Sequence, residues 1–273
     1  MIYRFVIIGI CFCFIEITGC KKPEESQVAG WGVKAVARLS PTVEVCWENR
    51  TEQDEEFKRL RSAFSNYARA QFDRTNVKLI GWADCDNPTS DNEIRITWTD
   101  SEESKFWWGD AKAIIGRGIA PYAPSPFWAK LKPSKNSNVR AAPTLAFNTR
   151  NFANLKNEVG EDFAVNSFLG TLLHELGHAV GLLHEMAHPN NTTYCNYGGD
   201  SYKSHVNDWA KIDAEEAIKA SVVASKKYDP KSIMNYCWTA NFRKTGTLLE
   251  LSQSDIFTIN ALYPLSAETS QEK

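Results

Sequence analysis

Hydrophobic and polar residues alternate in three short stretches of the first half of the chain. In residues 42–47, Val43, Val45 and Trp47 alternate with Thr42, Glu44 and Cys46, which is the period of a β-strand. Residues 77–82 and 93–98 have the same strand character. Between the first two stretches, residues 52–74 predict a helix, because apolar side chains recur three and four positions apart: Phe57, Leu60, Phe64 and Tyr67. Strand, helix and strand in this order predict a right-handed crossover and a mainly parallel sheet.

The second half of the chain contains two more extended pieces and three helical patterns. Residues 116–123 carry Pro121, which a central strand would not tolerate, so we place this piece at the edge of the sheet, and residues 143–148 form the other piece. Helices are predicted for residues 162–183, 205–227 and 252–262. The last of these has Ser252 as N-cap and Asp255 three residues later, in a capping-box arrangement. We expect one domain over residues 31–265 and a polar tail over residues 266–273.

The first 19 residues predict a signal peptide, because Arg4 precedes an apolar run from Phe5 to Ile15 that is too short for a stable membrane span. The run is followed by Ile-Thr-Gly-Cys ending at Cys20, which resembles the lipobox of bacterial lipoproteins. The resemblance implies a diacylated Cys20 that anchors the protein to a membrane, with residues 20–30 as a tether. Lys21 favours the outer membrane as the destination. A simple secretory signal, giving a periplasmic or secreted protein, is the alternative.

The charge of the chain argues against nucleic acid as a partner. The 273 residues include 31 basic and 33 acidic side chains, without a dense basic stretch, so nucleic acid is not an expected partner. We also expect a monomer.

Of seven cysteines, two lie in the signal and Cys20 would be acylated. The other four predict two disulfides in an exported protein. We favour Cys46 with Cys85 and Cys195 with Cys237, because each pair lies within one half of the chain; free buried thiols are the alternative.

The chemistry of the chain is concentrated in residues 174–185, whose sequence is HELGHAVGLLHE. His174 and His178 are four residues apart, so on a helix they project from one face and can bind one metal ion. A continuing helix would turn His184 away, so the helix must end, and Gly181 can make the necessary turn. Three imidazoles then leave one coordination position open, as in a catalytic zinc site. A rival set replaces the third histidine with Glu215 or Glu216.

The pattern HExxHxxGxxH resembles that of the metzincin zinc peptidases, and two later segments extend the resemblance. Residues 228–236 are similar to the Met-turn of the astacin branch, with Met234 at the methionine and Tyr236 two residues later, although Asn235 stands where astacins usually have histidine. Residues 251–263 are similar to the closing helix of astacins and matrix metalloproteinases. The resemblance implies an α+β, zincin-like fold with a mixed, mainly parallel twisted sheet, an active-site helix and a Met-turn.

The resemblance also implies a zinc-dependent endopeptidase that acts on extended protein or peptide substrates. One Zn2+ would be bound by His174, His178 and His184. Glu175 would accept a proton from the zinc-bound water and pass it to the leaving amine, and Tyr236 would stabilise the oxyanion. In astacins, glutamate at the position of Glu185 helps to bind the new N-terminus.

Two further expectations concern the substrate and the alternative function. Residues 118–122, at the expected edge of the sheet, could pair with the substrate backbone. The contrasting hypothesis is a non-catalytic lipoprotein whose zinc site is structural or binds a partner. Glu175 argues against it, because a structural zinc site has no use for a base beside the metal.

Overall fold

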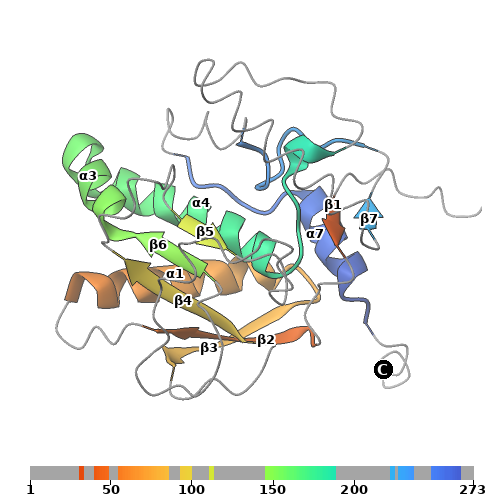
Figure 1. Ribbon diagram of the computed structural model, residues 1–273, viewed down its shortest axis with the longest axis horizontal. Helices are drawn as coiled ribbons and strands as arrows, with labels where there is room; N and C mark the ends of the chain where they lie inside the picture. The colour runs from red at the N-terminus through yellow and green to blue at the C-terminus, as the bar shows by residue number, and fades with distance from the viewer. Residues whose placement is uncertain are drawn as a thin grey trace, which may run out of the picture.

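The computed structural model describes nine segments of the chain: residues 31–33, 40–48, 55–85, 93–99, 111–113, 145–188, 222–224, 227–236 and 247–265. These segments contain, in chain order, β1 (Trp31–Val33), β2 (Thr42–Trp47), α1 (Glu55–Phe72), β3 (Lys78–Asp84), β4 (Ile94–Thr99), β5 (Ala111–Ala113), β6 (Leu145–Asn148), α3 (Thr149–Val159), α4 (Glu161–Ala179), η3 (Glu185–Ala187), β7 (Val222–Ala224) and α7 (Gln253–Leu262). Figure 1 shows a sheet lined by two long helices, with α7 beside a separate pair of short strands.

The main sheet has five strands in the order β3, β2, β4, β6, β5. The pairs β2–β3, β2–β4 and β4–β6 are parallel, whereas β5 pairs antiparallel with β6 at the edge. The prediction of a mixed, mainly parallel sheet is therefore confirmed. The edge strand next to β6 is β5, and the piece that we predicted for this place, residues 116–123, lies outside the described residues.

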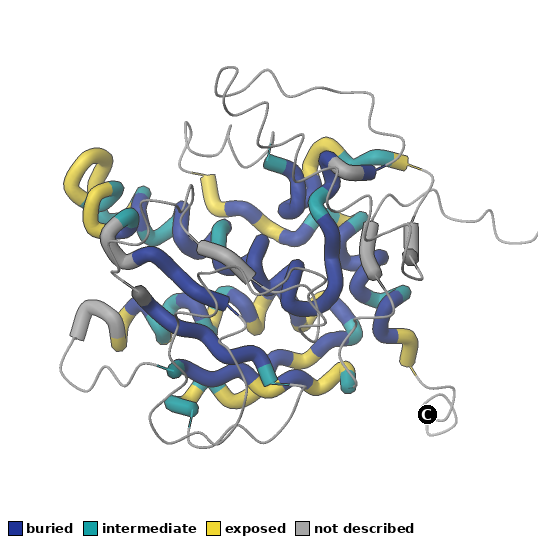
Figure 2. Tube along the Cα trace, viewed as in Figure 1, coloured by how far each residue is buried: buried dark blue, intermediate teal, exposed yellow. Residues whose placement is uncertain are grey.

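The core lies between the sheet and the helices α1 and α4, which also contact each other (Figure 1). The central strands β2, β4 and β6 consist mostly of buried residues, which are dark blue in Figure 2. Aromatic side chains fill much of this space: the rings of Trp47 and Trp98 stack at 5.7 Å between centroids, and Phe64 and Phe147 pack against Trp98. This apolar layer supports α4, the helix that carries the first two predicted metal ligands.

One predicted disulfide and one predicted helix cap are confirmed. Cys46 and Cys85 form a disulfide that joins β2 to the residue after β3. At the start of α7, the Ser252 side chain accepts a hydrogen bond from the backbone of Asp255, and the Asp255 side chain accepts one from the backbone of Ser252. The other predicted disulfide, Cys195–Cys237, lies outside the described residues.

Two of the predicted helices need correction. The helix predicted for residues 162–183 ends at Ala179 because the chain turns at Gly181, and a separate helix, α3, precedes it. The helix predicted for residues 205–227 is wrong at its end, where Val222–Ala224 forms β7 and pairs antiparallel with β1. Adjacent β-branched valines favour a strand at this point. The rest of that helix, residues 205–221, lies outside the described residues.

The predicted signal peptide (residues 1–19), the tether with Cys20 (20–30) and the tail (266–273) also lie outside the described residues. Among the helices that the structure describes, none combines the length and the apolar character that crossing a bilayer requires.

Candidate metal centre

The end of α4 places the histidines. His174 and His178 lie on its last two turns, and the backbone then bends at Gly181, which has φ 107°. The N–H groups of Gly181 and Leu182 donate to the carbonyl oxygens of His178 and Gly177, at 2.8 and 2.9 Å. This pair of bonds is the Schellman motif, in which glycine adopts a conformation that strains other residues. The predicted turn at Gly181 is thus present, and His184 follows it in extended conformation.

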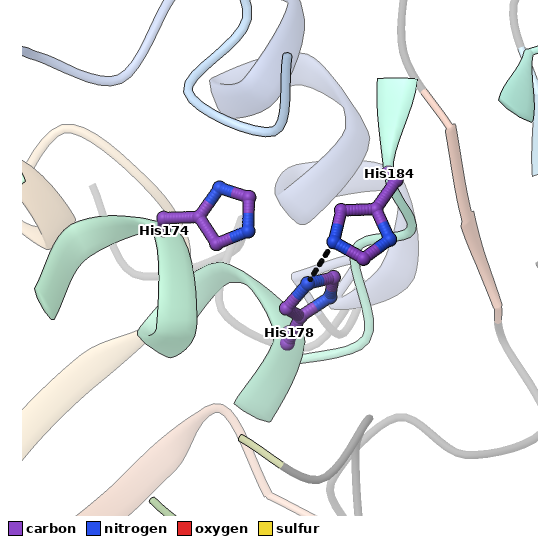
Figure 3. Close-up of side chains that lie close together, drawn as sticks. All are labelled: His174, His178 and His184. Carbon is purple, nitrogen blue, oxygen red and sulfur yellow. Dashed lines mark hydrogen bonds between the residues drawn. The ribbon is translucent and has the colours of Figure 1, made fainter. Parts of the chain in front are cut away.

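The three imidazoles point toward a common centre. Figure 3 shows His174 and His178 projecting from α4 and His184 reaching back from the segment after the turn. The ring centroid of His174 lies 4.9 Å from that of His178 and 5.4 Å from that of His184, and the centroids of the other pair are 4.4 Å apart. One nitrogen from each ring can be chosen so that all three lie within 4.8 Å of one another.

Backbone carbonyl groups orient two of these rings. The Nδ1 atom of His174 lies 2.8 Å from the oxygen of Ile233, and the Nδ1 atom of His178 lies 2.9 Å from the oxygen of Leu182. A carbonyl oxygen can only accept, so each Nδ1 carries the hydrogen, and the Nε2 lone pair of each neutral ring faces the common centre. Burial, assisted by the neighbouring imidazoles, lowers the pKa of His178 well below its usual value, which keeps the ring neutral.

This donor set fits a zinc ion. Nitrogen atoms about 2.0–2.1 Å from a tetrahedral zinc lie about 3.3 Å apart, and neutral imidazole is a ligand that zinc prefers. The Nε2 atoms of His178 and His184 are 3.0 Å apart. A second group of described residues with metal-ligand chemistry, Cys46, Cys85 and Glu93, has both sulfur atoms in the disulfide and is not available in that state. Glu215 and Glu216, the rival ligands, lie outside the described residues.

The two predicted catalytic residues come from different segments. Glu175 lies on α4 with the first two histidines, whereas Tyr236 follows the turn that carries Met234. Glu175 follows His174 on α4, is 6% exposed, and is not one of the three residues in the ligand cluster. The hydroxyl oxygen of Tyr236 lies 3.1 Å from Nε2 of His184. Its ring centroid is 5.0 Å from that of His184 and 5.3 Å from that of His174. The structure therefore brings Tyr236 to the three histidines from a segment distant in sequence.

The turn that carries Met234 lies directly beneath α4. A Cβ atom added to Gly177 would lie 2.6 Å from the Sδ atom of Met234, so the glycine leaves room for the methionine between the turns that bear His174 and His178. Asn235, fully buried, donates from its amide to the hydroxyl of Tyr228 at 2.7 Å and to the carbonyl oxygen of Pro230 at 3.2 Å. The asparagine therefore fixes the shape of the turn.

A buried carboxylate joins this turn to α7, a connection that the sequence analysis missed. Asp255 accepts hydrogen bonds from the Ser232 hydroxyl at 2.7 Å, from the Ile233 N–H at 3.0 Å and from the Ser252 N–H at 2.9 Å. Burial raises the pKa of Asp255, and these hydrogen bonds oppose the rise. Because the carbonyl of Ile233 receives the His174 ring, Asp255 is linked to a predicted ligand through one residue. The capping-box pattern predicts a role for Asp255 at the start of its own helix, but it does not indicate the contacts with Ser232 and Ile233.

Glu185 makes a second link between the same segments. It is 2% exposed, and its Oε1 atom accepts a hydrogen bond from the Asp229 N–H at 2.7 Å. Burial is the main cause that raises the pKa of this carboxyl to about 8, while the bond from Asp229 lowers it. In this structure Glu185 therefore fastens the segment after His184 to the start of the Met234 turn.

Comparisons with known proteins agree with this site. Residues 165–261 match the family model of the astacin peptidases, and this segment contains the three histidines, Glu175, Met234 and Tyr236. Protein SpAN of Strongylocentrotus purpuratus is 30% identical over 112 residues. This match covers 35% of our chain and 18% of SpAN, so the chain spans less than a fifth of that curated relative. The family-model match supports a zinc metallopeptidase.

Two solved structures resemble the chain at low identity. The structure of myroilysin aligns with 86% of our chain and 99% of its own, at 22% identity and a TM-score of 0.49. High choriolytic enzyme 1, a hatching enzyme zinc-protease of Oryzias latipes, aligns with 84% of our chain and 95% of its own, at 14% identity and a TM-score of 0.43.

Proposed function

We propose that the protein is a zinc-dependent endopeptidase with a metzincin-type active site, in which His174, His178 and His184 bind one catalytic zinc ion. The observation that carries this proposal is the convergence of three imidazoles after the turn at Gly181. Three protein ligands leave one position for a water molecule, whereas a structural zinc site would be closed by a fourth side chain. The turn at Met234 would serve as the Met-turn, an apolar support beneath the ligands.

Each step of the proposed reaction can be assigned to a particular residue of this chain. The zinc ion, when bound, supplies Lewis acidity that makes water a better nucleophile and polarises the substrate carbonyl. Glu175 accepts the proton of the attacking water and delivers it to the nitrogen of the leaving amine. The Tyr236 hydroxyl, close to His184, donates a hydrogen bond to the oxygen on which negative charge develops. The products are a new carboxylate and a new amine within a protein chain.

Replacement of Glu175 by alanine tests this proposal. The variant should still bind one equivalent of zinc, because Glu175 is not a ligand, while hydrolysis of a casein-type substrate should fall about 10²–10⁴-fold. Glu158→Ala, which removes an exposed glutamate from α3, is the matched control and should keep full activity. Undiminished hydrolysis by Glu175→Ala would exclude Glu175 as the base. A wild-type protein that binds zinc but cleaves no peptide in a mixed library would support a non-catalytic zinc lipoprotein instead.

We further propose that the protein is exported and anchored to the outer membrane through an acylated Cys20. The support for this proposal is the apolar run before Ile17-Thr18-Gly19-Cys20. Metabolic labelling with a fatty acid should mark the wild-type protein and the control variant Cys13→Ser, but not Cys20→Ser. Release of an unlabelled wild-type protein would favour a simple secretory signal.

A further inference from the structure

Met186 lies two residues after His184, and its thioether reaches the backbone of Tyr236. The side chain is 7% exposed, and its Sδ atom accepts a hydrogen bond from the Tyr236 N–H at 3.2 Å. In the same pair of segments, the N–H of Glu185 donates to the carbonyl oxygen of Met234 at 3.0 Å. Two hydrogen bonds therefore join residues 185–186 to residues 234–236, and one of them ends on a sulfur atom.

Through Tyr236, this contact connects Met186 to the histidines of the metal centre. Tyr236 is bound at its backbone by Met186, and at its hydroxyl it lies 3.1 Å from Nε2 of His184. Nε2 of His184 is also the nitrogen that faces His178. The phenol is a rigid ring on a short stem, so a shift of the Tyr236 backbone would move the hydroxyl relative to the three histidines by a similar distance.

We propose that Met186 is a positioning residue, whose sulfur fixes the backbone of Tyr236 so that the phenol reaches the metal centre. Neither the histidine pattern nor the turn at Met234 requires methionine at this position. If the side chain served only to fill space, leucine would replace it well, because leucine and methionine have similar volumes. Methionine differs from leucine in offering an acceptor, although a weak one.

The inference rests on the proposed function where it concerns catalysis, whereas the hydrogen bond itself can be tested without any activity. In Met186→Leu the Tyr236 N–H loses its acceptor, so its amide hydrogen should exchange faster in the zinc-loaded protein. A net hydrogen bond corresponds to a factor of about 2–13, so we expect acceleration in this range and a fall in kcat of the same order, with KM within about twofold. Met186→Gln, which keeps a polar acceptor on a chain of similar length, should recover most of both effects.

A double-mutant cycle with Tyr236→Phe separates positioning from general damage. If Met186 acts through the phenol, Met186→Leu should lower kcat in the wild-type background but have no further effect in Tyr236→Phe. Leu60→Met, which exchanges leucine for methionine at a buried position of α1, is the control for repacking of the core. It should leave both kcat and the exchange rate of the Tyr236 amide unchanged.

Two results would overturn the inference: an equal loss of kcat in both backgrounds, or a Tyr236 amide that exchanges at the wild-type rate in Met186→Leu. If no variant, including wild type, cleaves peptides, the proposed function fails. The amide exchange then still decides whether Met186 fixes Tyr236.

Discussion

The Nδ1 atom of His174 lies 2.8 Å from the backbone oxygen of Ile233, so the first predicted ligand on α4 is oriented by the turn that carries Met234. A ring held by Nδ1–H can offer only Nε2 to a metal. Since the N–H of the same residue, Ile233, is bound by Asp255, the position of this carbonyl depends on a carboxylate in α7.

We therefore expect Asp255→Asn to weaken zinc binding as well as stability. Both carboxylate oxygens accept hydrogen bonds, and an amide would turn an NH2 group toward one of the donors. A buried donor without an acceptor costs about 1–3 kcal/mol, and loss of an outer contact to a ligand lowers metal affinity about 10-fold or more. Chemical denaturation and competition with a chelator measure the two effects. Ser254→Ala, in the same helical turn, should change neither, and an unchanged zinc affinity in Asp255→Asn would restrict Asp255 to a role in folding.

Gly181→Ala should lower zinc affinity because it strains the turn that returns His184 to the site. A side chain at φ 107° costs about 1–2 kcal/mol. Gly160→Ala is a matched control, since Gly160 has φ 95° and a Cβ there would meet nothing within 4 Å. Both variants should lose similar stability without metal, but only Gly181→Ala should bind zinc more weakly. Equal zinc affinities would mean that the turn does not govern the third ligand.

Gly177→Ala should destabilise the protein although alanine favours helix. The added methyl group would lie 2.6 Å from Sδ of Met234, and overpacking of this kind costs about 1–3 kcal/mol. Gly170→Ala in the same helix is the comparison. A Cβ atom there would lie 3.1 Å from a side-chain carbon of Leu249. This variant gains the same helix propensity of about 1 kcal/mol and should be less destabilising. Thermal unfolding of the two variants decides this prediction, which is wrong if Gly177→Ala is the more stable of the pair.

Glu185 should make the stability of the metal-free protein fall as the pH rises. Burial raises its pKa from 4.5 to about 8, so between these values the folded protein keeps a proton that the unfolded chain has released. The free energy of unfolding then decreases by up to about 1.4 kcal/mol per pH unit. Histidines contribute in the same range, so the quantity to measure is the difference between Glu185→Gln and wild type. This difference should grow in favour of the variant from about pH 5 to 8 and level off above it; a difference independent of pH would contradict the prediction.

The local features of the site were predictable from sequence, whereas its long-range support was not. The spacing of His174, His178 and His184 predicts a helix that ends at Gly181, because helical geometry alone requires the turn. The link from Asp255 through Ile233 to His174 joins three distant segments, and no local pattern in any of them indicates the others. Met186 was missed for the same reason, since its partner is a backbone N–H that becomes a neighbour only in the fold.

The same distinction applies to the secondary structure. The strands with clear alternation, such as residues 42–47, and the capping box at Ser252 were predicted correctly because their signals are local. Strand β7 is three residues long and depends on its pairing with β1, so its local sequence alone predicts the end of a helix instead. The edge strand β5 is equally short and depends on its pairing with β6.

The central claim is that His174, His178 and His184 together bind one zinc ion. Crystals of the zinc-loaded protein, measured at the zinc absorption edge, test it most directly through the position of the anomalous peak. The account predicts one peak within about 2.0–2.1 Å of the Nε2 atoms of all three histidines, with a fourth position open to solvent. A peak bound by His174 and His178 together with Glu215 or Glu216, with His184 turned away, would contradict it.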